Sequence, residues 1–438
     1  MSEKLPRLIG PVDATLFIVA YTIGTAIFRV PGEVAANAGS VSVSLLLWAL
    51  GGLLCICGAL CYAELAVRVP RSGGEYSYLY ASFGPGLAFV LAWSALFASP
   101  VAIAAVARGF ADYLSVLLPL DESLRRLAAA SAIAILASIS MYSTRGSTRI
   151  ASIAAVGKVL AVLALAYVGI ATAAAPEAAA TAPQSVWQLA QLGTAMVAVI
   201  WAYDGSTSVS YIGGEVRDPQ RTLPISLFAG IGVVTVAYVL LNAVYFHALG
   251  FAGVAGSEAV AAVTLDAVIG PTSASVMAVL VMASALGTMA AQVVGNPRYF
   301  VVAAEDGLFP RRLAAVSPVT LTPMNAILMT AVIAIGLVTV GGYGLLIRLY
   351  VLSFYPLVVV ALCGAVILRL RHGVPRTFAM PWYPWPLVVY AVGIIGICVS
   401  SAFDDPAGAL FGLMVPVSGA VVYVVKQRWW PDALRQES

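Results

Sequence analysis

Long apolar stretches follow one another along nearly the whole chain, separated by short polar connections. Twelve can be delimited, at about 12–37, 42–66, 83–117, 126–143, 150–173, 188–213, 223–249, 273–303, 323–341, 343–368, 384–402 and 407–425. Each holds at least the roughly 17 residues that an α-helix needs to cross a bilayer. The pattern therefore predicts an all-α integral membrane protein with 12 transmembrane helices, folded as one transmembrane domain over residues 1–438.

Composition agrees with a membrane setting. Hydrophobic residues make up 61% of the 438 residues and charged residues 10%, whereas a soluble domain carries about 25% charged residues. So little charge cannot cover a soluble surface, and we expect the lipid bilayer to surround the protein. The net charge of +3 gives no reason to expect nucleic acid as a partner. The five cysteines lie inside apolar stretches and there are only two histidines, so we predict no metal site and no cofactor.

Lys and Arg residues divide unevenly between alternate connections. Seventeen of the 23 lie in the set that includes both chain ends, and only Arg125 and Arg126 lie in the opposite set. Because short cytoplasmic connections are rich in Lys and Arg, we expect both termini to be cytoplasmic. The first apolar stretch is longer than the core of a signal peptide, so we expect it to stay as the first span of a multi-pass protein of the cell membrane.

Two of the stretches are interrupted at mid-membrane depth. The first contains Gly24-Thr25-Ala26, and the sixth contains Asp204-Gly205-Ser206-Thr207-Ser208. Irregular backbone at this depth is tolerated only when it is buried in protein or lines a cavity. The interruptions lie five spans apart, as in transporters built from two inverted five-helix repeats. We place these repeats at about 12–173 and 188–368, followed by two further helices at about 384–425. The alternative is that Gly24 only permits close helix packing and that Gly205 only permits a kink.

An interrupted helix offers a specific chemistry. Where a half-helix begins, free N–H groups and the positive end of its dipole attract a carboxylate. Where a half-helix ends, its last carbonyl oxygens lack partners and attract an ammonium. Two interrupted helices side by side would therefore bind the zwitterion of an α-amino acid.

Several motifs at and between these positions resemble a known family. The chain resembles the amino acid–polyamine–organocation superfamily and, within it, prokaryotic members of the L-type amino acid transporter family. The motifs that carry the resemblance are Gly24-Thr25-Ala26-Ile27-Phe28, Leu60-Cys61-Tyr62-Ala63-Glu64-Leu65, Pro70-Arg71-Ser72-Gly73-Gly74-Glu75-Tyr76, Ala202-Tyr203-Asp204-Gly205 and Asp306-Gly307-Leu308-Phe309-Pro310. The resemblance implies the twelve-helix LeuT-type fold of two inverted repeats with helices 1 and 6 broken.

The resemblance also implies the substrate site. The carboxylate of an amino acid would meet backbone N–H groups of the first break, and its ammonium would meet carbonyl groups of both breaks. Trp201 matches an aromatic position that closes over the substrate from outside, although plain core packing is the alternative. The implied substrate-binding residues are Tyr21, Thr22, Ile23, Gly24, Thr25, Ala26 and Ile27 in the first break, and Ile200, Trp201, Ala202, Tyr203, Asp204 and Gly205 in the second.

The chain departs from the family pattern at one residue inside the first motif and at the residue directly after it. Ala26 stands where the family has Gly, and its methyl group narrows the site and favours small side chains. Arg29 occupies a position that is often apolar. We expect Arg29 either to pair with Glu33, four residues along the helix, or to steer substrate in an outer vestibule.

Lys158 lies about two turns into the fifth stretch. In the resembled family, a lysine here takes the place of the sodium ion that sodium-coupled relatives bind beside the first break. This implies transport without sodium and makes Lys158 a candidate for coupling to protons, because burial favours the neutral amine. The alternative is a lysine that reaches the cytoplasmic surface along its own helix.

Other ionisable residues are candidates for selectivity and gating. Asp204 either is capped by Ser206–Ser208 and nearby N–H groups or helps to select the substrate. Ion pairs among residues at the cytoplasmic helix ends would close an inner gate; the candidates are Glu64, Arg71, Glu75, Glu215, Arg217 and Arg298.

The sequence thus predicts a secondary transporter of small neutral L-amino acids that works by alternating access, through sodium-independent exchange or proton-linked uptake. Cationic amino acids or polyamines are the alternative substrates. An integral membrane enzyme is a third reading, but it would need a cluster of nucleophiles, acids or metal ligands that the pattern does not offer. The connection Leu118–Arg126 lacks the cysteine with which animal members bind a glycoprotein heavy chain, so no such subunit is expected.

Overall fold

The computed structural model describes residues 7, 9–171, 189–257, 259–270, 273–339, 343–404 and 406–429. The predicted positions of the two chain ends, and the edges of the predicted stretches at 172–173, 188 and 340–341, lie outside these residues. The elements are α1 Pro11–Thr22, α2 Ala26–Ala38, α3 Val41–Arg68, α4 Gly74–Phe83, α5 Pro85–Leu117, α6 Glu122–Tyr142, α7 Thr144–Ala171, α8 Leu189–Ala202, η1 Ser208–Glu215, α9 Pro219–Ala255, α10 Val260–Ile269, α11 Ser273–Gly295, α12 Pro297–Glu305, η2 Arg311–Leu313, α13 Met324–Val338, α14 Tyr343–His372, α15 Trp385–Asp404 and α16 Pro406–Trp429.

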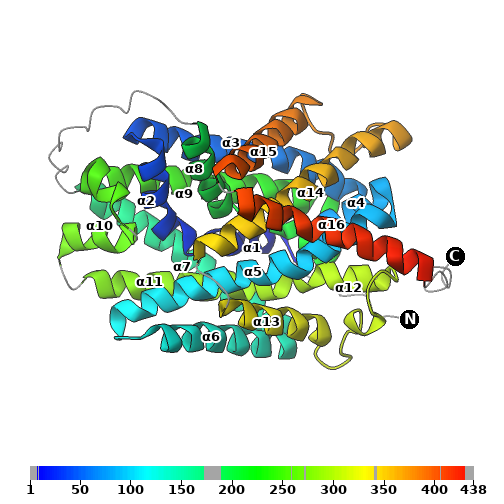
Figure 1. The fold of residues 1–438 in the computed structure, drawn as a ribbon, viewed down its shortest axis with the longest axis horizontal. Coiled ribbons are helices and arrows are strands. Elements are labelled where there is room, and N and C mark those ends of the chain that lie inside the picture. The colour runs from blue at the N-terminus through cyan, green and yellow to red at the C-terminus, as the bar shows by residue number, and fades with distance from the viewer. Residues whose placement is uncertain are drawn as a thin grey trace.

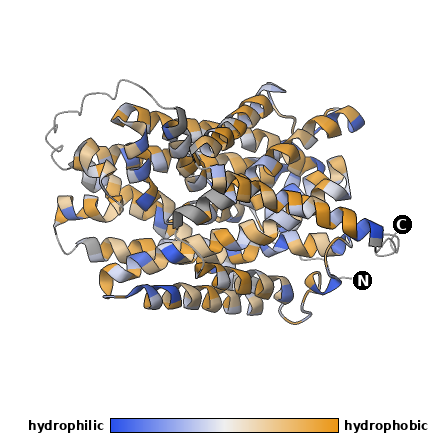
Figure 2. Ribbon diagram, viewed as in Figure 1, coloured by the Kyte–Doolittle hydropathy of each residue, from blue (hydrophilic) through white to orange (hydrophobic). Residues whose placement is uncertain are grey.

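These helices confirm the prediction of an all-α membrane protein. Within the described residues, nine helices are long and apolar enough to cross a membrane, and the bent pair α1 and α2 makes a tenth candidate. The shorter apolar helices α8 and α13 coincide with the sixth and ninth predicted stretches. A count of 12 spans therefore stays a prediction. Hydrophobic residues cover most of each helix, and hydrophilic residues gather near some helix ends, as at the end of α16 (Figure 2).

Local sequence signals explain where several helices begin. Ser40 precedes α3, and its hydroxyl accepts a hydrogen bond from the backbone N–H of Val43. Asp121 precedes α6, and its carboxylate accepts one from Leu124 in the same way. These side chains satisfy N–H groups that lack a partner in the first helical turn. The short helices α4 and α10 were not among the predicted stretches, since each has only 10 residues.

The first half-helix, α1, lies in the middle of the bundle (Figure 1). It packs against α9, α7 and α11, while α2 packs against α8. Seven of the twelve residues of α1 are buried, including Phe17, Ile18 and Tyr21. This central position surrounds the first break with protein on all sides, which is the setting in which irregular backbone is tolerated at membrane depth.

Candidate functional site

The first predicted break is present. The helix α1 ends at Thr22, α2 begins at Ala26, and the two axes are bent by 51°. In the connection, the N–H group of Gly24 turns back to the carbonyl of Thr22 at 2.8 Å. The first N–H groups of α2 therefore follow a non-helical segment and have no preceding turn to bond to.

The second predicted break is also present. The helix α8 ends at Ala202, turns occupy residues 203–207, and the 3₁₀-helix η1 begins at Ser208. Gly205 has a φ of 88°, and a Cβ atom there would lie 2.1 Å from a ring carbon of Tyr21. Gly205 is thus needed both for the left-handed backbone and for the contact between the breaks.

Tyr238 of α9 joins the two breaks directly. Its hydroxyl lies 3.1 Å from the carbonyl oxygen of Thr22 and 2.7 Å from that of Ala202, so that it bonds the last residue of each half-helix. Tyr238 is fully buried. This role could not be predicted from the sequence, because a tyrosine in a long apolar helix such as α9, which also contains Tyr245, is usually a packing residue.

A cavity, here called the central cavity, lies between the breaks. Seven of the predicted substrate-binding residues line it: Tyr21, Thr22, Gly24, Thr25, Ala26, Trp201 and Asp204. Val106 of α5 and Thr288 and Gln292 of α11 complete the wall. The other predicted residues lie outside this wall, namely Ile23, Ile27, Ile200, Ala202, Tyr203 and Gly205. Of these, Tyr203 points elsewhere, since its hydroxyl donates to the carbonyl of Trp48 at 3.1 Å.

Three polar groups in the wall of the central cavity have unused bonding capacity. The side-chain oxygens of Thr22, Thr25 and Gln292 are buried and have no hydrogen-bond partner among the described residues. Leaving a buried polar atom unpaired costs about 1–3 kcal/mol. Three such atoms give the wall of the central cavity free capacity to bond a polar molecule.

The ends of α1 and α8 also retain open carbonyl groups. The carbonyl of Ile23 already accepts hydrogen bonds from Ser284 and Thr288, each at 3.1 Å. The carbonyls of Tyr21 and Ile200 receive no hydrogen bond within the described part of the chain. These two oxygens, one from a residue that lines the central cavity and one from a residue that lines the second cavity described below, are therefore available to accept a hydrogen bond.

Asp204 is held mainly by α14. The hydroxyls of Tyr350 and Tyr355 donate to its Oδ1 atom at 2.9 and 3.1 Å. Of the predicted cap, a backbone N–H group of its own turn, that of Gly205, bonds the carboxylate, whereas the described structure shows no hydrogen bond to it from Ser206–Ser208. Asp204 lines the central cavity and also a second one, here called the tyrosine cavity.

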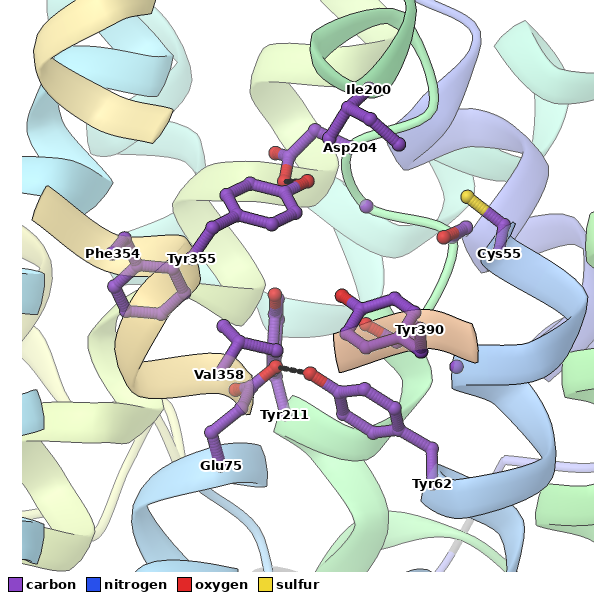
Figure 3. Close-up of a pocket in the computed structure, with 14 residues that line it drawn as sticks. Cys55, Tyr62, Glu75, Ile200, Asp204, Tyr211, Phe354, Tyr355, Val358 and Tyr390 are labelled. Carbon is purple, nitrogen blue, oxygen red and sulfur yellow. Dashed lines mark hydrogen bonds between the residues drawn. The ribbon is translucent and has the colours of Figure 1, made fainter. Parts of the chain in front are cut away.

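The tyrosine cavity extends from the second break towards α4. Figure 3 shows Asp204 near one end and Glu75, bonded to Tyr62, near the other. Tyr211 and Tyr390 lie between these ends. Among the described residues, the cavity wall contains two carboxylates and no Lys, Arg or His residue.

Lys158 is buried and does not reach the surface along its helix. Its Nζ atom donates to the carbonyl of Ala20 at 2.7 Å and to the Thr288 hydroxyl at 2.8 Å. The Thr288 hydroxyl in turn contacts the carbonyls of Ala20 and Ile23. The ammonium therefore stands beside the first break, where the resemblance implied it, and the alternative of a surface-reaching lysine is wrong.

Trp201 lies in the wall of the central cavity and is 6% exposed. Its ring packs edge-on against Tyr350, with the ring centres 5.3 Å apart. Tyr350 is the same residue that binds Asp204. Trp201 thus lines the cavity and also packs in the core, and its closure over a substrate from outside stays a prediction.

Several of the predicted gate residues form ion pairs. Arg298 of α12 contacts Glu215 of η1 at 3.0 Å, and both are buried. Arg71 contacts Asp306 at 2.9 Å. Both pairs join segments that lie far apart in the sequence, as a closed gate requires.

Glu64 belongs to a third cluster. It bonds Arg68 on its own helix at 3.1 Å and Arg369 of α14 at 2.7 Å. Its other oxygen accepts from the backbone N–H of Met380 at 2.8 Å. This cluster fastens α3 to α14 and to the loop that follows α14.

Two of the predicted gate residues, Glu75 and Arg217, form no ion pair among the described residues in this state, and their part in a gate stays a prediction. Glu75 has no cationic partner among the described residues; instead the hydroxyls of Tyr62 and Tyr299 donate to its two oxygens. The carboxyl is buried because Gly73 and Gly74 turn the start of α4 into the bundle. This burial raises the pKa of Glu75, while the two hydrogen bonds oppose the shift. Arg217 is exposed and forms no ion pair within the described ranges.

Together these features define a class of protein. A bundle of membrane-spanning helices in which two interrupted helices enclose one polar cavity is the architecture of secondary transporters with broken helices. A comparison of sequences agrees: the profile of the amino acid permease family matches residues 9–426, and the chain belongs to this family, within the amino acid–polyamine–organocation superfamily.

Similar proteins are found among characterised transporters. The chain is 31% identical to the human large neutral amino acids transporter small subunit 2, over 97% of this chain and 81% of the relative. It is 28% identical to the mouse b(0,+)-type amino acid transporter 1, over 96% and 88%. It is 29% identical to the mouse Asc-type amino acid transporter 1, over 97% and 82%.

Proposed function

We propose that the protein carries small neutral L-amino acids across the cell membrane by alternating access. The observation that carries this proposal is the central cavity, where two helix breaks meet and three buried oxygens lack partners. A zwitterion supplies both a donor and an acceptor to such a wall. A carrier also fits better than an enzyme, because the described cavity residues include no nucleophile paired with a base.

The proposed pose follows from the helix ends. The carboxylate binds the first N–H groups of α2, at Thr25, Ala26 and Ile27, where the helix dipole is positive. The ammonium binds the carbonyls of Tyr21 and Ile200. Thr25 Oγ1, which is unpaired, then accepts or donates one further hydrogen bond.

The preference for small substrates rests on the wall of the central cavity. The methyl group of Ala26 faces this cavity. Thr25 is wedged against α5 so tightly that a Cβ atom at Gly109 would lie 2.7 Å from its hydroxyl. The wall therefore cannot retreat easily on this side, and large side chains fit poorly.

Lys158 supports transport without sodium. Its ammonium already bonds Ala20 and Thr288 beside the first break, so one positive charge is built into the place where a sodium ion would otherwise bind. We propose exchange of one amino acid for another, or uptake linked to a proton that Lys158 takes up and releases.

The orientation of the protein in the membrane follows from the charges of its connections. Placing both termini in the cytoplasm puts the Arg298–Glu215 and Arg71–Asp306 pairs at the inner side. These pairs close the inner gate in this state, and Trp201 covers the central cavity on its outer side. No heavy-chain subunit is expected.

A second substrate class is favoured by Asp204. Its carboxylate lines the central cavity and would attract the second positive charge of a cationic amino acid or a polyamine. One relative is named a b(0,+)-type amino acid transporter. The two tyrosines that hold Asp204 partly satisfy it without such a ligand, which is why we place neutral substrates first.

Uptake into proteoliposomes tests the proposal. Purified protein in vesicles preloaded with alanine should accumulate radiolabelled alanine equally in sodium and choline buffers, and unlabelled serine should compete better than leucine or arginine. Empty vesicles give the background, and vesicles without internal amino acid separate exchange from net uptake. Uptake that requires sodium, or competition led by arginine or putrescine, would contradict the neutral sodium-independent carrier.

A further inference from the structure

A third cavity, here called the outer cavity, lies beyond the central cavity. Arg29 of α2, Asp112 of α5 and Arg125 of α6 supply its charged wall, together with Tyr113 and Ser115. It encloses about 600 Å³, part of which is open to solvent. The three charged side chains are between 27% and 34% exposed, so they are partly desolvated yet reachable.

The outer cavity and the central cavity share two helices, α2 and α5. Arg29 follows Ala26 by three residues, which is about 4.5 Å along α2, and Asp112 follows Val106 by six residues, about 9 Å along α5. Ala26 and Val106 both line the central cavity. The outer cavity therefore begins one to two helical turns away, on the same side as Arg125 and Arg126, which the charge pattern places outside.

Asp112 is bound strongly on one oxygen and weakly on the other. Its Oδ2 atom lies 2.6 Å from Nη1 of Arg29, the ion pair that joins α2 to α5. The sequence analysis left two readings of Arg29, a pair with Glu33 or steering of substrate in an outer vestibule; the observed pair with Asp112 crosses between helices that spacing alone cannot relate. The Oδ1 atom of Asp112 lies 3.8 Å from a guanidinium nitrogen of Arg125. This oxygen can still accept a hydrogen bond.

Arg125 has unused donors. Its contacts to Asp112 and Glu122 measure 3.8 and 3.7 Å, which is longer than a hydrogen bond. Its Nε atom is buried and has no hydrogen-bond partner in the ranges that the structure describes. Glu122 is meanwhile bound closely by Arg108 at 2.8 Å and Arg126 at 2.9 Å. Arg125 is thus the arginine of this cluster whose guanidinium N–H groups make the fewest close hydrogen bonds.

We propose that the outer cavity is a capture site that binds the incoming amino acid zwitterion before the substrate enters the central cavity. The substrate carboxylate binds Arg125, whose guanidinium matches a carboxylate with two parallel hydrogen bonds. The substrate ammonium binds the open oxygen of Asp112. This inference rests on the proposed function and adds a second site for the same substrate class.

Kinetics of three variants test the capture site. Arg125→Gln should raise the KM for alanine about two- to fivefold, the size expected of one partly exposed charged contact, and should leave kcat unchanged. Arg125→Lys should recover part of the loss. Arg126→Gln is the matched control, because Arg126 is a neighbouring arginine that is 46% exposed and bonds Glu122 without lining the cavity.

Two further measurements make the result decisive. The KM of the unaltered protein should rise with ionic strength more than that of Arg125→Gln, because salt screens the captured charge. Equal KM values for Arg125→Gln and Arg126→Gln would overturn the capture site while the proposed function stands. A dependence of uptake on chloride is tested by replacing chloride with gluconate. If uptake depends on chloride while the KM for Arg125→Gln does not change, the cavity holds only an inorganic anion and the capture site is overturned. No alanine uptake by the unaltered protein would contradict the proposed function and the capture site together.

Discussion

Replacing Lys158 by Met removes the ammonium that braces the first break but keeps most of the side-chain volume. In the structure this ammonium makes two short hydrogen bonds, at 2.7 Å to Ala20 and 2.8 Å to Thr288. The Thr288 hydroxyl also bonds Ala20 directly at 3.0 Å, so one link between α11 and the break survives the substitution. The variant therefore loses the two hydrogen bonds of Lys158 at the first break but keeps the bond between Thr288 and Ala20.

The expected magnitudes separate transport from stability. Hydrogen bonds to a charged group contribute about 1.5–3 kcal/mol each, and burying a lysine at membrane depth costs about 2.5–3.5 kcal/mol. Because these terms nearly offset each other, Lys158→Met should change the free energy of unfolding by no more than about 3 kcal/mol. If the substitution weakens the first break by the equivalent of one net hydrogen bond, about 1.4 kcal/mol, alanine exchange should slow about tenfold.

The assay pairs exchange in proteoliposomes with the melting temperature in detergent. Lys158→Ala should behave similarly but melt somewhat lower, because it also leaves a void. Exchange by Lys158→Met within twofold of the unaltered protein would refute the reasoning. So would a loss of folded protein large enough to account for the whole loss of transport.

Three other variants test the remaining contacts. Gly205→Ala should destabilise the protein by about 1–3 kcal/mol and abolish exchange, because the new Cβ would strike a tyrosine ring, whereas Gly232→Ala, with nothing within 4 Å, should melt no lower than the unaltered protein. Arg298→Gln should cost about 3–5 kcal/mol by leaving Glu215 buried and unpaired, and replacing both partners by apolar residues of similar size should restore most of the melting temperature. Burial raises the pKa of Glu75 above its ordinary value of 4.5, so the stabilising contribution of this carboxyl is complete below about pH 4.5 and is lost as the pH rises through the raised pKa. The unaltered protein should therefore lose stability relative to Glu75→Gln over that pH range. Melting temperatures of the two proteins that change in parallel with pH would contradict this.

The two breaks could be predicted from the sequence because their signal is local. A run of small and polar residues within an apolar stretch, such as Asp204-Gly205-Ser206, is unfavourable in a regular helix that faces lipid. The burial of Lys158 beside the first break followed from its depth in the fifth stretch, once the family resemblance placed it. These predictions required only information from residues nearby in the sequence or within one motif. They required no knowledge of contacts between distant segments.

The partners across the bundle could not be predicted. Tyr238 and Thr288 lie in long apolar helices, and the carbonyl groups that they contact lie far away in the sequence. Ser284, Thr288 and Gln292 recur every four residues on α11, but their spacing does not say which cavity they face. Glu75 forms no ion pair among the described residues in this state, because the glycines before it turn the carboxyl into the core. Such contacts depend on how helices pack, which a single sequence does not reveal.

The central claim is that the two helix breaks bind one amino acid zwitterion between them. A structure determined with saturating alanine tests it most directly. The account predicts alanine in the central cavity, with its carboxylate on the N–H groups of Thr25, Ala26 and Ile27 and its ammonium on the carbonyls of Tyr21 and Ile200. Alanine bound elsewhere in the bundle, with the first turn of α2 left without a ligand, would contradict it.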